Sequence, residues 1–165
     1  MGAISADRAV VAGWHGLALG GLPYDEPAAA WKAILDRFPA LPGWPQLPRR
    51  SPLEGMYAQF GEQFPGITLE GQSIIVDRRA QLNRGLERLY LAYLEDDADY
   101  GRISPEHAGG LDALLNGTVA LRRPPVAIRG QVTGPVSWGL SVVDQNRRPI
   151  IYDQVLQDAV GKHLR

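Results

Sequence analysis

The sequence has no cysteine and no excess of charge of either sign. The absence of Cys among 165 residues excludes disulfides, thiolate zinc sites and a Cys nucleophile within this chain. The chain has 17 Lys and Arg against 18 Asp and Glu, so its net charge is −1. It therefore lacks the excess of basic residues that is typical of proteins that bind nucleic acid. We therefore expect no nucleic-acid partner.

Long hydrophobic runs are missing as well. The longest uncharged stretch, residues 9–24, is too short to span a bilayer and is interrupted by glycines, a His and a Pro. The charges of Asp7 and Arg8 cancel, so no positively charged region precedes this stretch. It is therefore not typical of a signal peptide. The sequence predicts a cytoplasmic protein with no membrane partner.

The composition that is present suits a folded protein. Hydrophobic residues make up 45% of the chain, which is enough to bury a core, and 19 Gly with 13 Pro indicate many turns. The length fits one domain of ordinary size. It falls short of the roughly 250 residues of a complete (β/α)8 barrel.

Hydrophobic patterning predicts strands that alternate with helices, which favours a parallel sheet. The expected strands are Val10–Leu19, Trp44–Leu47 and Val126–Val132. The first expected helix is capped by Asp25 and ends near Phe38, and the second is opened by Ser51. The third is Arg78–Leu94, and the fourth is Ser104–Leu115 with Gly117 as its stop. The fifth begins near Pro135, and the sixth is capped by Asp153.

Two further features complete the expected organisation. Ile67–Leu69 and Ser73–Val76 are separated by a short Gly-containing turn and predict a small hairpin. The last helix reaches Arg165 with no Gly, Asn or Pro after it, and three parallel strands are few for a sheet that stands alone. These two observations predict a truncated domain that continues beyond Arg165.

The turn after the first expected strand is rich in glycine. Gly20 and Gly21 precede Leu22-Pro23 and a helix start, where backbone N–H groups favour an anion and glycines let a ligand approach. A tight turn with no ligand explains the same residues. The turn is neither a Walker loop nor a Gly-x-Gly-x-x-Gly motif.

Polar residues follow the second expected strand. Gln46, Arg49 and Arg50 lie at its carboxyl end, where α/β sheets place ligands, and Arg suits a carboxylate or a phosphate. A solvated basic pair is the alternative interpretation.

The end of the third expected strand has a similar character. Thr133, Gly134 and Ser137 surround Pro135, which is pre-set for the first turn of a helix. The two hydroxyls either cap that helix or bind a ligand carboxylate.

The remaining candidates for chemistry are isolated. His15, His107 and His163 are far apart in sequence, and no His, Asp and Glu residues have the spacing of a metal site. No Gly-x-Ser-x-Gly elbow supports Ser-His-Asp chemistry.

Taken in order, four segments resemble the first half of the catalytic domain of cobalamin-independent methionine synthase, within its superfamily with uroporphyrinogen decarboxylase. The segments are Leu19-Gly20-Gly21-Leu22-Pro23, Trp44-Pro45-Gln46-Leu47-Pro48-Arg49, Met56-Tyr57-Ala58-Gln59-Phe60-Gly61-Glu62-Gln63 and Val132-Thr133-Gly134-Pro135-Val136-Ser137. Gly21 stands where the family has Ser, and Gln46, Arg49 and Arg50 occupy the region of its Gly-Glu-Pro-Glu-Arg sequence.

The resemblance implies a partial (β/α)8 TIM barrel: residues 1–165 would form its N-terminal half, with the first three or four βα units and a small β-hairpin. It implies transfer of a methyl group from a folate or corrinoid donor to a thiol such as homocysteine. It further implies zinc in the complete protein, with no zinc ligand within this chain. The residues expected to bind substrate are Gly20, Gly21, Gln46, Arg49, Arg50, Thr133, Gly134 and Ser137.

Two alternatives stay open at this point. One is a lyase of the uroporphyrinogen decarboxylase type, in which Arg49 and Arg50 bind substrate carboxylates without a metal. The other is an inactive barrel fragment, which would expose the edge of its third strand and self-associate.

Overall fold

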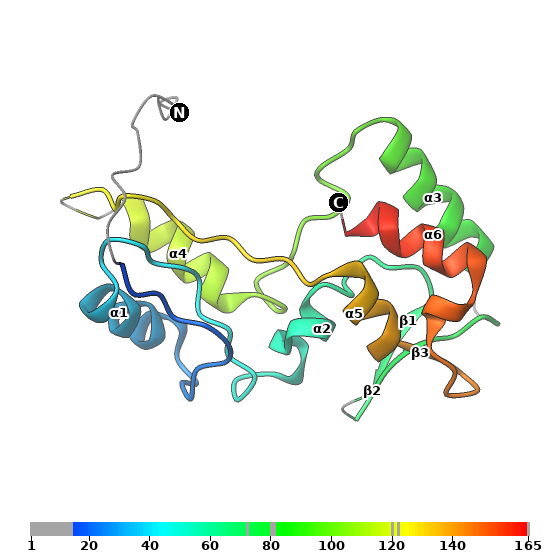
Figure 1. Ribbon diagram of the computed structural model, residues 1–165, viewed down its shortest axis with the longest axis horizontal. Helices are drawn as coiled ribbons and strands as arrows, with labels where there is room; N and C mark the ends of the chain where they lie inside the picture. The colour runs from blue at the N-terminus through cyan, green and yellow to red at the C-terminus, as the bar shows by residue number, and fades with distance from the viewer. Residues whose placement is uncertain (1–14, 72, 80–81, 120, 122, 165) are drawn as a thin grey trace.

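The computed structural model describes residues 15–71, 73–79, 82–119, 121 and 123–164, and these residues form a mixed α/β fold (Figure 1). The α-helices are α1 (Pro27–Arg37), α2 (Met56–Gln59), α3 (Leu82–Leu94), α4 (Gly109–Val119), α5 (Pro135–Ser141) and α6 (Gln154–His163). The strands are β1 (Ile67–Glu70), β2 (Ser73–Val76) and β3 (Val143–Asp144), and two 3-10 helices are η1 (Pro52–Glu54) and η2 (Ile150–Tyr152).

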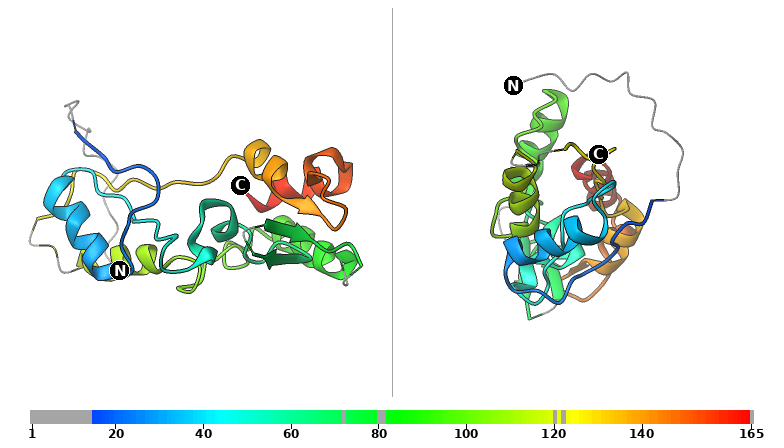
Figure 2. Two further views of the ribbon diagram at one scale, coloured as in Figure 1. Left: turned by 90° about the horizontal axis from the view of Figure 1, so that it is seen from below. Right: turned by 90° about the vertical axis from the view of Figure 1, so that its left-hand side faces the viewer.

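The molecule is elongated, and the described residues form two hydrophobic cores. The smaller core lies where α1 packs on α4 and contains Trp31, Ile34 and Leu114. The larger core lies among α3, α5, α6 and the sheet, toward the opposite end in Figures 1 and 2. Trp44 packs against both cores, and it therefore lies at the junction between them.

The predicted hairpin is confirmed, and it belongs to a three-stranded sheet in the order β1-β2-β3. β1 pairs with β2 in antiparallel register, Ile67 opposite Val76, whereas β2 pairs with β3 in parallel. Alternate residues of β1 are exposed, as expected of an edge strand, and Ile74–Val76 of the central strand β2 are all buried.

At the second and third predicted strands, and just after the first, the structure has isolated parallel bridges in place of a continuous ladder. Gly21 bridges to Gln46 and Gly43 bridges to Arg129, so residues 15–22, 40–47 and 126–132 lie side by side in chain order. The ladder is interrupted because Pro42, Pro45 and Pro48 have no amide hydrogen to donate.

The first predicted strand, Val10–Leu19, is only partly testable. Residues 10–14 lie outside the described residues, and residues 15–19 form no strand. Leu19 is 71% exposed, which corrects the expectation of a buried strand there.

Most predicted helices are confirmed, with shifted ends. Asp153 accepts hydrogen bonds from the amides of Val155 and Leu156 and caps α6 as expected, and Ser51 caps η1. The helix expected at Ser104–Leu115 instead begins at Gly109 and runs through Gly117, because Ser104 to His107 form a hydrogen-bonded turn. Asp25 is not a cap, since α1 begins at Pro27 with no side-chain cap bond.

None of the helices in the described part of the chain combines the length and the apolar character that crossing a membrane requires.

Candidate functional site

The ends of the first two extended segments meet at the Gly21–Gln46 bridge. The amide of Leu22 donates to the carbonyl oxygen of Gln46 at 2.8 Å. Gly20 has a φ of 82°, a conformation that favours glycine, and a Cβ on Gly21 would lie 2.9 Å from Cγ of Pro48. The glycines therefore serve a tight junction between the segments, and Gly20 has open space beside it.

A buried chain of amides leads inward from this junction. Gln46 donates from Nε2 to Oε1 of Gln59 at 3.3 Å, and Gln59 donates from Nε2 to the carbonyl oxygen of His107 at 2.8 Å. Both side chains are buried. The chain links the second extended segment, α2 and the turn before α4, so it fixes the orientation of the Gln46 amide.

The two arginines after the second segment differ in their surroundings. Arg49 makes an exposed ion pair with Asp25 at 3.3 Å. Arg50 pairs with Glu54, whose side chain is 0% exposed, and the pair lies against Gly109 at the start of α4. Both guanidinium groups are thus already matched by carboxylates.

The third segment contributes less to the junction. Thr133 is buried, whereas Gly134, which precedes α5 as its N-cap, and Ser137 are exposed. Neither hydroxyl caps α5. The N-cap position is held by Gly134, which has no side chain to accept a hydrogen bond, and Ser137 lies inside the helix, where its carbonyl oxygen accepts from the hydroxyl of Ser141. Among the described residues, no hydrogen bond joins these three residues to Gly21 or Gln46. The structure therefore places Gly20 and Gly21 beside Gln46, just ahead of Arg49 and Arg50 in the chain, and among the described residues no hydrogen bond links them to the third group.

Sequence reasoning missed the buried polar residues Glu54 and Gln59. Glu54 follows Ser51 by three residues, the spacing of a capping box at a helix start, and Gln59 lies within the third segment that carries the resemblance. Oε2 of Glu54 is buried and has no hydrogen-bond partner among the described residues. The signal that could have found Glu54 is its i, i+4 spacing from Arg50.

A second polar cluster joins Glu62, Ser104 and His107. Oε2 of Glu62 accepts from the amide of Ser104 at 2.7 Å and lies 3.2 Å from Nδ1 of His107, and Oγ of Ser104 lies 3.1 Å from the same ring nitrogen. A catalytic triad needs the acid and the nucleophile on different ring nitrogens. This cluster therefore closes a turn and does not form a relay.

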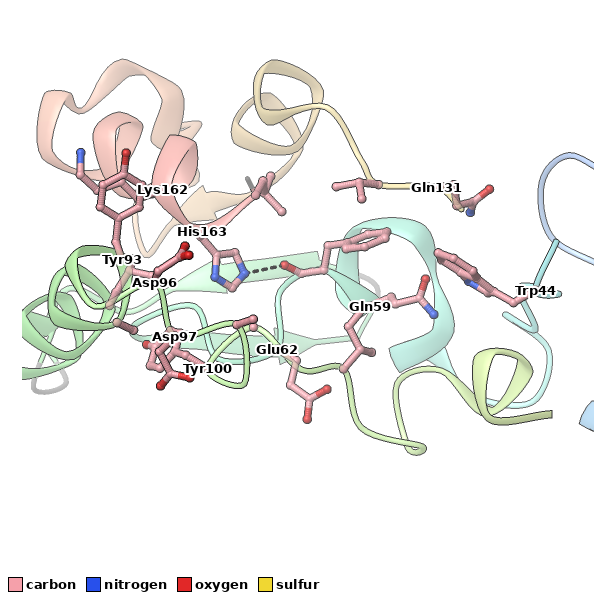
Figure 3. Close-up of a pocket in the computed structure, with 18 residues that line it drawn as sticks. Trp44, Gln59, Glu62, Tyr93, Asp96, Asp97, Tyr100, Gln131, Lys162 and His163 are labelled. Atoms are coloured by element: carbon pink, nitrogen blue, oxygen red, sulfur yellow. Dashed lines mark hydrogen bonds between the residues drawn. The ribbon is translucent and has the colours of Figure 1, made fainter. Parts of the chain in front are cut away.

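A cavity of about 360 Å³ lies beside the larger core, and Gln59 of the amide chain is one of its lining residues (Figure 3). None of the eight predicted substrate-binding residues lines it. Its walls come from Trp44, from Gln59 and Glu62 near α2, from α3 and the loop after it, from Gln131, and from the end of α6.

His163 is a titratable group at the cavity wall whose pKa is shifted by its surroundings. Its Nε2 lies 2.8 Å from the carbonyl oxygen of Phe60, and its ring packs edge-on against Phe64 at 5.3 Å between centroids. Burial lowers the pKa of His163 below its ordinary value, and the contact with the Phe60 carbonyl only partly opposes this shift. The imidazole is therefore neutral at pH 7.

The described residues do not fit a metal centre. They contain no group of three or more His, Asp or Glu side chains that could hold a metal ion. The zinc implied by the resemblance therefore has no ligand set within the part of the chain that the structure describes.

Comparison with known proteins adds no relative. No family model matches the sequence, and no curated protein or solved structure matches it significantly.

We expect Arg50→Ala to lower the free energy of unfolding by about 2 kcal/mol, because it leaves the Glu54 carboxylate buried without its partner. This figure is below the 3–5 kcal/mol typical of a fully buried pair, because Arg50 is 35% exposed and partly screened by water. Arg49→Ala is the matched control and should cost less than about 0.5 kcal/mol, since its pair with Asp25 is exposed. Urea denaturation measures both, and equal losses would contradict the assignment.

We expect the free energy of unfolding to fall as the pH is lowered below 6.5, the ordinary pKa of histidine. The pKa of His163 is lowered in the folded state, so the unfolded chain binds the proton first and is favoured by acid. Stability from neutral His163 is thus fully present above pH 6.5 and is lost as the pH falls toward the folded pKa. Denaturation curves at pH 8, 7, 6 and 5 check this, and the slope should flatten in His163→Gln.

Proposed function

We propose that this chain provides the substrate-binding part of a methyltransferase of the cobalamin-independent methionine synthase type. The reaction is transfer of a methyl group from a folate or corrinoid donor to a thiol such as homocysteine. The observation that supports this proposal most is the pair of parallel bridges, Gly21 to Gln46 and Gly43 to Arg129.

These bridges matter because they order the three segments as a βα barrel would. Neighbouring segments run parallel in chain order, and helices α1 and α4 cover one side of them. The carboxyl ends of such strands form the ligand-binding face of a barrel. The four segments that carry the resemblance include the ends of all three extended segments.

Within this proposal, the residues at the junction bind the polar end of the thiol substrate. The open space beside Gly20 admits a ligand to the backbone, and the Gln46 amide, held by Gln59, is oriented before the ligand arrives. In the reaction, the thiolate sulfur forms a bond to the methyl carbon while the bond from methyl to donor breaks. The electron pair of that bond stays on the donor, and the thiol proton passes to solvent.

The test is a methyl-transfer assay on the protein expressed from its complete reading frame, with homocysteine and either methylcobalamin or a methyl-folate, and with zinc supplied. Mass spectrometry should detect S-methylated product. Gln46→Leu should lower kcat/KM about tenfold, because it removes the amide that binds the substrate, which corresponds to the loss of one hydrogen bond. Lys32→Ala is the control, because Lys32 forms only an exposed pair with Asp36.

Absence of product with either donor, including with 2-mercaptoethanesulfonate as a second thiol, would refute the proposal. The lyase alternative receives less support, since Arg49 and Arg50 are both paired with carboxylates and are not free to bind those of a substrate.

A further inference from the structure

The third extended segment, residues 126–132, has a free edge. Arg129 donates its amide to the carbonyl oxygen of Pro42 at 2.8 Å, so this residue faces the neighbouring segment. In an extended chain, successive residues turn their backbone N–H groups to opposite edges, so the amides of Ile128 and Gly130 face away from that neighbour. Among the described residues, neither amide makes a hydrogen bond. Figure 1 shows the segment, in yellow, along the upper border of the molecule on its way to α5.

The apolar side chains of this segment point outward. From residue 126 to residue 134 the even-numbered positions are exposed, and the odd-numbered positions are buried or partly buried. Ile128 is 43% exposed and Val132 is 64% exposed. The one charged residue of this stretch, Arg129, is directed inward, where its guanidinium donates to the carbonyl oxygen of Ala18 at 3.3 Å. The outward side of the segment is therefore apolar and uncharged.

The free edge also lacks the features that keep edges apart in monomeric proteins. Exposed edge strands commonly carry Lys, Pro or a bulge, each of which blocks pairing with another chain. Residues 126–134 contain neither Lys nor Pro. An apolar edge without such a block is satisfied when another extended chain adds to it and accepts its hydrogen bonds.

The segment is complementary to a second copy of itself. In antiparallel pairing about a two-fold axis at Gly130, each Ile128 lies opposite Val132 of the second copy, and the two glycines lie opposite one another. Aliphatic side chains directly opposite each other stabilise a pair of strands. The same register places Arg129 opposite Gln131, so the two guanidinium groups do not meet.

Neighbouring registers are less favourable. An axis at Arg129 would place the two arginines directly opposite each other, and like charges in that position are destabilising. An axis at Ile128 would place Pro124 opposite Val132, and proline has no amide hydrogen to donate. The register centred on Gly130 avoids both problems.

We propose that two copies of this chain associate by antiparallel pairing of residues 126–134 about a two-fold axis at Gly130. Both copies use the same edge, so the association closes as a dimer and does not grow further. The inference rests on this edge and is independent of the proposed methyl transfer.

The first test measures the oligomeric state of the full chain by sedimentation over a range of concentrations. We expect a reversible equilibrium between monomer and dimer. Ile128→Lys places a charge opposite Val132 at two symmetry-related positions, so it should raise the dissociation constant about 100-fold, a factor of about ten for each position. Leu94→Lys is the matched control, because Leu94 is 77% exposed at the end of α3, in a different part of the molecule, and the dissociation constant should not change (Figure 1).

A second variant tests the backbone of the edge. Gly130→Pro removes an outward amide and adds no charge, so it should weaken the dimer while the circular dichroism of the monomer stays unchanged.

A cysteine cross-link tests the register, and the chain suits this test because it has no Cys of its own. Gly130→Cys places two thiols opposite each other, with Cα atoms about 5.5 Å apart, a separation that a disulfide spans. A Cβ at Gly130 would lie 3.9 Å from the Trp44 ring, an ordinary contact, so the substitution fits. Val126→Cys is the control, because its two copies would lie about 27 Å apart along the paired strands. Under mild oxidation, only Gly130→Cys should form a covalent dimer.

Several outcomes would overturn the proposal. A protein that stays monomeric at its highest soluble concentration would do so, and slow hydrogen exchange at the Gly130 amide of that monomer would assign the edge to another segment of the same chain. Assemblies larger than a dimer, a dimer unaffected by Gly130→Pro, equal effects of Ile128→Lys and Leu94→Lys, or equal cross-linking of the two cysteine variants would each show that the edge does not pair in this way.

Discussion

Trp138→Ala is expected to lower the free energy of unfolding by about 3–5 kcal/mol, the range for truncating a buried aromatic side chain. Trp138 lies in α5 and is 0% exposed within the larger core. A domain of this size is typically stable by only 5–15 kcal/mol in total. The variant should therefore be close to unfolding, with a much lower midpoint in urea.

The size of this effect follows from how many elements the indole joins. Its ring meets Phe64 edge-to-face at 4.9 Å between centroids and lies 6.1 Å from the ring of His163 at the end of α6. Its Nε1 donates to the carbonyl oxygen of Tyr57 in α2 at 2.8 Å. Alanine removes the packing and also leaves this carbonyl without its donor.

Leu140→Ala provides the matched control on the same helix. Leu140 is two residues away and 46% exposed, so its truncation should change the free energy of unfolding by less than about 0.5 kcal/mol. Trp138→Phe should fall between the two, since it keeps an aromatic ring and loses the hydrogen bond to Tyr57. A loss below 1 kcal/mol for Trp138→Ala would show that the larger core does not depend on α5.

The sequence predicted best those elements whose determining residues lie close together in the chain. The hairpin was predictable because two apolar runs flank a short Gly-containing turn, and α6 was predictable because Asp153 precedes a stripe that includes Leu156 and Val160. In both cases the residues that determine the element lie within a dozen positions of one another.

The extended segments show why the strands were harder to predict. Apolar residues in 126–132 favoured a strand, but the neighbour that must supply its hydrogen bonds contains Pro42 and Pro45. Strand formation depends on the partner segment, and the bridged partners Gly43 and Arg129, 86 positions apart, leave no mark on the local pattern. The parallel order of the segments was expected, whereas their reduction to single bridges was not.

In the candidate site, too, some features were predictable from the local sequence and others depend on tertiary packing. Gln46 was predicted as a candidate from its place at the end of the second expected strand, and its bridge to Gly21 is consistent with the parallel order that was expected. The partners of Gln46 were not predictable, because Gln59 and the carbonyl of His107 reach it through tertiary packing. His163 is likewise isolated in the sequence, and only packing reveals its contacts with Phe60 and Phe64.

Gly110→Ala is expected to destabilise the protein by at least about 2 kcal/mol, although alanine is normally the better helix former. A Cβ at Gly110 would overlap the carbonyl oxygen of Pro45 and lie 2.8 Å from the Pro45 carbonyl carbon. Both are backbone atoms, so neither can rotate away, and overpacking of this kind costs about 1–3 kcal/mol or more. Because Pro45 precedes Gln46, the displacement should also disturb the Gln46–Gln59 hydrogen bond.

Gly161→Ala tests whether the sign of the change in the free energy of unfolding depends on the room available for a Cβ atom. Gly161 lies in α6 with no atom near the position of a Cβ, so the intrinsic preference for alanine should apply and stabilise the protein by about 1 kcal/mol. The two substitutions are chemically identical and both lie in helices, so a difference of about 3 kcal/mol between them in urea denaturation isolates the contact with Pro45. If Gly110→Ala stabilised the protein as Gly161→Ala does, α4 could not pack against residues 43–47 as closely as the structure requires, and the buried setting of Gln46 would be lost with it.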